Sequence, residues 1–100
     1  MLRDINRRRN AGEYASILIV DDEPINIDIL LALIFAEEML SDAALSGYEA
    51  LDMVKKRCKL VKSGQAQPYK LIIIDYSMPV MSGIQAATAI RETVRSFGQA

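Results

Sequence analysis

The chain has 100 residues, enough for one domain at most, and 51% of them are hydrophobic, so a small buried core is possible. Its net charge of -1 argues against a general nucleic-acid-binding protein. No apolar run approaches the roughly 18 residues of a membrane span, no signal-peptide segment is seen, and the one cysteine cannot form an internal disulfide. We therefore expect a protein of the reducing cytoplasm, without contact to nucleic acid or membrane. The lack of histidine excludes a phosphohistidine on this chain.

Residues 1–15 show no apolar periodicity and contain four arginines, namely Arg3, Arg7, Arg8 and Arg9. We predict a basic, flexible leader or inter-domain linker here. A targeting or anion-binding arm is the alternative, which Asp4 and Glu13 weaken. The folded domain is predicted to occupy residues 16–100.

The first predicted strand, residues 16–21, is an apolar run that ends in acidic residues. Asp21, Asp22 and Glu23 form its exit loop, and Pro24 suits the first turn of a helix, where a missing N–H costs nothing. This helix is predicted to continue to about Met39. Its sheet-facing residues recur at helical spacing: Ile27, Leu30, Leu31, Ile34 and Phe35.

A weak, alanine-rich strand is predicted at residues 40–45, followed by a turn at Ser46-Gly47 and a helix over residues 48–59. Ala50, Leu51 and Val54 should face inward. The basic residues Lys55, Lys56 and Arg57 should face outward as a solvated surface, with partner docking as the alternative. Residues 60–68 are predicted to form a loop.

The third strand, Leu71 to Ile74, has no polar alternation and therefore reads as a strand buried on both faces of a parallel sheet. It ends in Asp75, and a loop with Pro79 and Gly83 follows. The last helix is predicted over residues 84–97, with Ile84, Ala87, Ile90 and Val94 on one face. The repeated strand–helix order predicts a parallel sheet with right-handed crossovers.

Asp21, Asp22 and Asp75 should converge, because parallel strands end at the same edge of a sheet. At about 5 Å and an effective dielectric constant of about 20, each pair of carboxylates repels by roughly 3 kcal/mol. A hard divalent cation with oxygen ligands would offset that repulsion. A lone strand-end aspartate can also serve as a turn or helix cap, but three in register favour a metal site.

Two motifs resemble the receiver (response-regulator) domain of two-component phosphorelays. Ile19-Val20-Asp21-Asp22-Glu23-Pro24-Ile25-Asn26 is similar to the acidic-pair motif of that family, and Ile74-Asp75-Tyr76-Ser77-Met78-Pro79-Val80-Met81-Ser82-Gly83 is similar to its phosphoacceptor loop. The Met-Pro-Val-Met-x-Gly form looks most like receivers of hybrid histidine kinases. The resemblance covers roughly residues 16–97.

The resemblance implies an α/β fold, a flavodoxin-like doubly wound parallel sheet of the 2-1-3-4-5 type. Only the first three strands and three helices would be present, so the receiver would be truncated at its C-terminus and lack the last two strands. The third strand would then be a bare apolar sheet edge, and we expect an isolated chain that is marginally stable or self-associates.

The resemblance also implies the chemistry. Asp75 would be the nucleophile that accepts a phosphoryl group from a phosphohistidine. Asp22 and Asp75 would bind Mg²⁺, Asp21 would act through a bound water, and the backbone carbonyl of Ser77 would supply another oxygen. The implied partner is a histidine kinase or a histidine phosphotransfer protein.

The main departure is that no lysine follows Lys70, whereas the family carries a lysine after its fifth strand and a Ser or Thr after its fourth. A degenerate receiver-like module that binds a protein partner without phosphorylation is therefore the alternative function. A Mg²⁺-dependent phosphatase is disfavoured, because such enzymes usually carry a second acid where this chain has Ser77. We accordingly expect a phosphoacceptor and not an enzyme.

Overall fold

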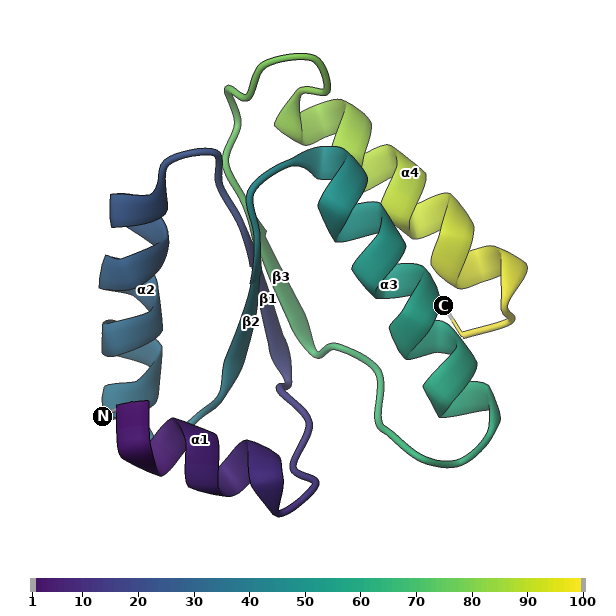
Figure 1. Ribbon diagram of the computed structural model, residues 1–100. Helices are drawn as coiled ribbons and strands as arrows, with labels where there is room; N and C mark the ends of the chain where they lie inside the picture. The colour runs from purple at the N-terminus through teal and green to yellow at the C-terminus, as the bar shows by residue number, and fades with distance from the viewer. Residues whose placement is uncertain (1, 100) are drawn as a thin grey trace.

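The structure is a computed structural model that describes residues 2–99, in which helices cover both faces of a three-stranded parallel sheet (Figure 1). Its elements, in chain order, are α1 (Leu2–Asn10), β1 (Ile17–Val20), α2 (Pro24–Ala36), β2 (Ser41–Ala44), α3 (Gly47–Lys62), β3 (Leu71–Ile74) and α4 (Gly83–Ser96). No helix in this described part is long and apolar enough to cross a membrane.

The strand order is β2-β1-β3, and both neighbouring pairs are parallel. Ile17 at the start of β1 lies in register with Ser41 of β2 and with Leu71 of β3. Helix α2 covers one face of the sheet, while α3 and α4 lie side by side on the other (Figure 1). This order confirms the 2-1-3 part of the predicted 2-1-3-4-5 strand order.

The central strand β1 divides the core into two layers. Leu18 and Val20 point toward α3 and α4, whereas Ile17 and Ile19 point toward α2, as the two-residue period of a strand requires. Burying each such side chain stabilises the fold by about 1.5–3 kcal/mol. The strand is thus fixed in position, and with it the loop that follows Val20.

Local capping sets where two of the helices begin. The hydroxyl of Ser46 accepts a hydrogen bond from the backbone N–H of Glu49 at the start of α3. At the start of α4, Ser82 and Gln85 cap each other's backbone N–H groups in a capping box. Helix α2 begins with Pro24 at its first turn, as predicted from the sequence.

Helix α1 differs from the flexible leader predicted for residues 1–15, and the described chain has four helices instead of three. Long-range contacts hold α1 against the domain. Arg9 donates to a carboxylate oxygen of Asp42 at 2.9 Å and to the carbonyl of Ser41 at 2.7 Å. Arg8 donates to the carbonyl of Glu38 at 3.0 Å. Met1 lies outside the described residues.

Arg57 corrects a second expectation, because its side chain is buried and not on a solvated surface. The residue is only 5% exposed. Its guanidinium donates to the carbonyl of Ala15 at 2.6 Å, pairs with Asp42 at 3.3 Å and lies over the ring of Tyr69, 3.9 Å from the centroid. Tyr69 in turn donates its hydroxyl to Asp42 at 2.6 Å. Lys55 and Lys56 are exposed, as predicted.

Burial raises the pKa of the Tyr69 hydroxyl, and the hydrogen bond to the Asp42 carboxylate raises it further. Both effects favour the protonated form, which is the form that can donate to Asp42. Arg57, Asp42 and Tyr69 therefore form a polar cluster, here called the Arg57 cluster. It joins α3, β2 and the segment before β3 at the amino-terminal end of the sheet.

β3 is an edge strand of the described sheet, as expected for a receiver without its last two strands, and its isoleucines contact the core layers on both faces but are less buried than predicted. Leu71 is 52% exposed, and Ile72, Ile73 and Ile74 are only partly buried.

The buried face of helix α4 also differs from the predicted one. Ala86 and Ile90 are buried there, whereas Ile84 is exposed.

We expect the 100-residue chain to self-associate, because β3 presents an unpaired and apolar edge. Sedimentation velocity over a range of protein concentrations should show oligomers that dissociate on dilution. Leu71→Lys places a charge on that edge and should reduce the association. Tyr48→Lys, at an exposed position of α3, is the matched control and should leave it unchanged. A monomer at every concentration, with a sharp and concentration-independent unfolding transition, would contradict the prediction.

Candidate metal centre

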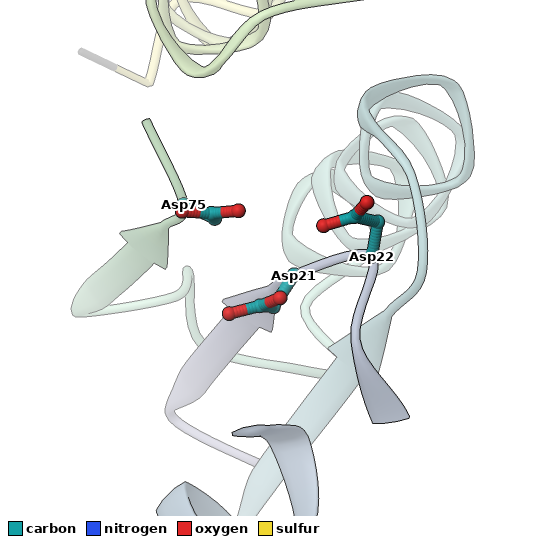
Figure 2. A group of neighbouring side chains, drawn as sticks. All are labelled: Asp21, Asp22 and Asp75. Carbon is teal, nitrogen blue, oxygen red and sulfur yellow. The ribbon is translucent and has the colours of Figure 1, made fainter. Parts of the chain in front are cut away.

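Three carboxylates come together where the sheet ends. Asp21 follows the last residue of β1, and Asp75 follows the last residue of β3, so both leave the carboxyl edge of the sheet. One oxygen each from Asp21, Asp22 and Asp75 lies within 4.8 Å of the other two (Figure 2). The convergence predicted from the two strand–acid motifs is therefore confirmed.

Backbone hydrogen bonds continue beyond the strands and hold these residues in place. The N–H of Asp75 donates to the carbonyl of Val20 at 2.8 Å, and the N–H of Asp21 donates to the carbonyl of Ala44 at 3.1 Å. A side-chain oxygen of Asp21 also accepts from the N–H of Glu23 at 2.9 Å, which fixes the turn into α2. Rigid elements thus position the site.

The electrostatics of the site favour a cation. Asp21 is buried, Asp22 and Asp75 are partly buried, and the ion pairs formed among residues 2–99 involve none of these three carboxylates. At about 5 Å and an effective dielectric constant of about 20, each pair repels by roughly 3 kcal/mol. The donor set is entirely carboxylate oxygen, which suits Mg²⁺. Partial exposure of two members leaves room for the water ligands that this ion retains.

Ser77 lies in the loop between β3 and α4 and is exposed. Its backbone carbonyl stays a predicted ligand. The same loop is held to the domain by Met78, whose side chain is buried in the core layer under α3 and α4. The site therefore combines rigid strand ends with a loop that is anchored by Met78 and, less deeply, by Met81.

Gly83, which the sequence predicts in the loop after Asp75, is the first residue of α4 and packs against the backbone of that loop. Its N–H donates to the carbonyl of Tyr76 at 3.1 Å. A Cβ at this position would overlap the carbonyl oxygen of Asp75 and would lie 2.9 Å from Cα of Tyr76. The start of α4 can approach the backbone of Asp75 this closely only because residue 83 has no side chain.

Gly83→Ala is therefore expected to displace Asp75 and to weaken cation binding as well as stability. Because the obstacle is backbone, the free energy of unfolding should fall by about 1–3 kcal/mol. Urea denaturation measures this loss, and a Mg²⁺ titration followed by NMR measures affinity. Ile84→Ala, at the exposed neighbouring position, is the control and should change neither quantity appreciably. Unchanged Mg²⁺ affinity in Gly83→Ala would show that the close approach does not position Asp75.

The known proteins to which this chain is similar agree with one another in the family they indicate. A family profile described as the response regulator receiver domain matches residues 17–97. Hybrid signal transduction histidine kinase B of Dictyostelium discoideum is 38% identical over 80 residues, which are 80% of this chain and 4% of that protein. The response regulator mcs4 of Schizosaccharomyces pombe is 34% identical over 80 residues, which are 80% of this chain and 13% of that protein.

A solved structure is also similar. The receiver domain of the histidine kinase CKI1 from Arabidopsis thaliana, crystallised with Mg²⁺ and BeF₃⁻, superimposes with a TM-score of 0.76 and 27% sequence identity. The match covers 84% of this chain and 59% of that one. The chain thus spans less than two thirds of the solved structure and only a small part of the two full-length relatives.

Proposed function

This chain belongs to the response regulator receiver domain family, and from that premise we propose that it is the phosphoacceptor module of a two-component phosphorelay. Asp75 accepts a phosphoryl group from a phosphohistidine, and Mg²⁺ assists. The observation that carries this proposal is the convergence of Asp21, Asp22 and Asp75 within 4.8 Å. The Mg²⁺ and BeF₃⁻ in the CKI1 receiver crystals support the ion and the anionic group that we assign to this site.

In the proposed reaction, a carboxylate oxygen of Asp75 attacks the phosphorus atom of the phosphohistidine. The new O–P bond forms as the N–P bond breaks, and the electron pair of that bond returns to the imidazole of the donor. Asp75 is suited to this role because it ends a rigid strand and is still partly exposed. When bound, Mg²⁺ neutralises the negative charge of the transferring phosphoryl oxygens.

The other two acids hold the cation. Asp22 would bind Mg²⁺ together with Asp75, while Asp21 would act through a water molecule, and one of its oxygens already accepts from the N–H of Glu23. This assignment of roles comes from the resemblance to receiver domains, and the partial exposure of Asp22 and Asp75 is compatible with their proposed direct contact with the hydrated ion. The Ser77 carbonyl is the additional oxygen ligand in the proposal.

Receivers of hybrid kinases interact with histidine kinases or phosphotransfer proteins, and we propose such a protein as the phosphoryl donor here. In this proposal the module carries a phosphoryl group stoichiometrically and is not a turnover enzyme, and it acts in the cytoplasm. A direct test is transfer of a radiolabelled phosphoryl group from the phosphohistidine of a hybrid-kinase transmitter domain.

That transfer should be measured on the 100-residue chain and on a longer version continued by the last two strands of a related receiver. Label on either protein in the presence of Mg²⁺ supports the proposal. Label on the longer version alone would show that the reaction needs the added strands, which carry the family's Ser or Thr and its lysine; no lysine follows Lys70 in this chain. Label on neither would favour the unphosphorylated interaction module.

Mg²⁺ is expected to stabilise the folded chain through the same site. At a free concentration of ten times the dissociation constant, the gain in unfolding free energy should be about 1.4 kcal/mol. Thermal denaturation with and without Mg²⁺ measures it. Asp22→Asn should remove most of the gain, whereas Asp28→Asn, an exposed acid of α2, should preserve it. Equal stabilisation in both variants would place the cation elsewhere.

A further inference from the structure

Val80 combines an exposed apolar side chain with an unusual backbone conformation. Its side chain is 88% exposed, more than any other large hydrophobic side chain in the described residues. Its φ is 69°, in the left-handed region that residues branched at Cβ rarely adopt. Val80 lies in the loop between β3 and α4, after Asp75. Neither the apolar surface in water nor the strained backbone is favoured by the stability of the fold.

The strain belongs to a tight turn that is centred on Val80. The backbone N–H of Met81 donates to the carbonyl of Pro79 at 2.8 Å, so the turn is closed within three residues. The positive φ of the central residue is typical of the rare and strained form of such a turn. Glycine adopts a left-handed conformation without steric cost, and asparagine tolerates it better than valine does. The turn itself therefore gives no reason for a valine at this position.

The core holds both flanks of this turn but not Val80. Met78 is buried in the layer under α3 and α4, and Met81 packs against the same layer. Further along the loop, the N–H of Gly83 donates to the carbonyl of Tyr76 at 3.1 Å. Strained backbone persists only where surrounding contacts fix it, and these contacts do so. The side chain of Val80 is left in solvent, where it contributes little to packing.

The position of the turn indicates what Val80 can contact. The loop begins directly after Asp75 and returns to the backbone of that residue at Gly83, so it lies at the carboxyl edge of the sheet with the three aspartates. Figure 1 shows the loop extending beyond the ends of the strands. A protein that brings a phosphohistidine to Asp75 has to approach this edge and cover the neighbouring loop. Acetyl phosphate is too small to do so.

We propose that Val80 is a recognition residue for the phosphoryl donor and that it binds an apolar side chain on the surface of the phosphohistidine-bearing protein. This inference rests on the proposed phosphoacceptor function and adds the chemistry of the contact between the two proteins. Burial of the valine side chain at the interface removes apolar surface from water, which is favourable. The fixed turn presents that side chain before the donor arrives, so little conformational freedom is lost on binding.

Rates of phosphoryl transfer from two donors test the proposal, with Mg²⁺ present and in the version of the chain that is labelled on Asp75. One donor is the phosphorylated transmitter domain of a hybrid kinase, and the other is acetyl phosphate. Val80→Thr keeps the branched shape and the strained φ but replaces a methyl group by a hydroxyl. It should lower the second-order rate constant for the transmitter domain about tenfold and change that for acetyl phosphate by less than about twofold. Val80→Ile stays apolar and should react with both donors within about twofold of the parent rate.

Val80→Asn separates the strain from the contact. Because asparagine tolerates a positive φ, this variant should raise the midpoint of urea denaturation, whereas transfer from the transmitter domain should fall at least as far as in Val80→Thr. A lower midpoint would contradict the strain on which the inference depends. Leu71→Thr, an exposed aliphatic position at the other end of β3, is the matched control and should be labelled by both donors at the parent rate.

Equal transfer from the transmitter domain to the parent and to Val80→Thr would overturn the proposal and leave the phosphoacceptor function intact. An equal loss with both donors would also overturn it, because the substitution would then act on Asp75 itself. Changed self-association in sedimentation velocity, with unchanged transfer, would assign Val80 to a contact between copies of this chain instead. Absence of label on the parent from both donors would overturn the phosphoacceptor function and this inference with it.

Discussion

Asp75→Asn is expected to abolish phosphoryl incorporation from acetyl phosphate and Mg²⁺, in the 100-residue chain or in its extended version, whichever the parent sequence labels. The amide of asparagine has nearly the shape of the carboxylate but neither its nucleophilic oxygen nor its charge. The backbone bond from residue 75 to the carbonyl of Val20 is retained, so the strand end should keep its position. Intact-protein mass spectrometry measures the result as the presence or absence of one added phosphoryl group.

Asp75→Asn should also raise the stability of the metal-free chain, whereas a substitution that merely disrupted the fold would lower it. In the absence of Mg²⁺ it removes one of three repelling carboxylates, and the free energy of unfolding should rise by about 1–3 kcal/mol. The stabilisation by Mg²⁺ should largely disappear. Asp28→Asn is the control for loss of a surface charge and should be labelled normally. Undiminished labelling of Asp75→Asn would show that another residue is the acceptor.

Arg57→Met is expected to lower the free energy of unfolding by about 3–5 kcal/mol, the range for removal of one partner from a buried ion pair. Methionine retains much of the apolar stem but none of the donors. The carbonyl of Ala15 would then lose its 2.6 Å hydrogen bond, and Asp42 would lose one of its two arginine partners. The stacking on Tyr69 would also disappear. Urea denaturation followed by circular dichroism measures the change.

Lys56→Met is the matched control, because it removes a positive charge from the adjacent position of α3. Its ion pair with Asp52 is exposed, and such pairs contribute little. The control should change the free energy of unfolding by less than about 0.5 kcal/mol. Equal losses in the two variants would mean that the Arg57 cluster acts as ordinary surface charge, contrary to its burial in the structure.

The convergence of the three carboxylates was the feature of the molecule that the sequence predicted best. Each of the strands β1 and β3 is a run of four apolar residues closed by aspartate, so the strand end and the acid are marked by adjacent residues. The parallel arrangement then follows from the helix between successive strands. Because both signals are local, the convergence of Asp21 and Asp75 could be predicted without knowledge of distant contacts.

Helix α1 and the Arg57 cluster could not be predicted in the same way, because their partners are distant in sequence. Arg9 and Arg57 both meet Asp42, which lies 33 residues after one and 15 residues before the other. One signal for Arg57 was present. Its spacing of seven residues from Ala50 and three from Val54 places it on the buried face of α3. Because Lys55 and Lys56 precede it, Arg57 was grouped with them as part of an exposed basic surface.

The extent to which β3 is buried and the role of Gly83 depend on tertiary context, although the edge position of β3 followed from the resemblance to receiver domains. Leu71 to Ile74 has the composition of a buried strand, but its burial depends on a neighbour beyond β3 that the described sheet does not contain. A glycine after a proline turn indicates a loop, but only the structure shows that its missing side chain makes room for the carbonyl of Asp75. Sequence patterns predict where helices and strands lie in the chain better than they predict how closely those elements pack against one another.

The most direct test of the account is to locate the phosphoryl group after incubation with acetyl phosphate. The 100-residue chain and its extended version would be digested and the modified peptide sequenced by tandem mass spectrometry, with and without Mg²⁺. We predict a single phosphoryl group on Asp75, formed only when Mg²⁺ is present. A group on another residue, incorporation that is independent of Mg²⁺, or no incorporation in either version would contradict the assignment of this site.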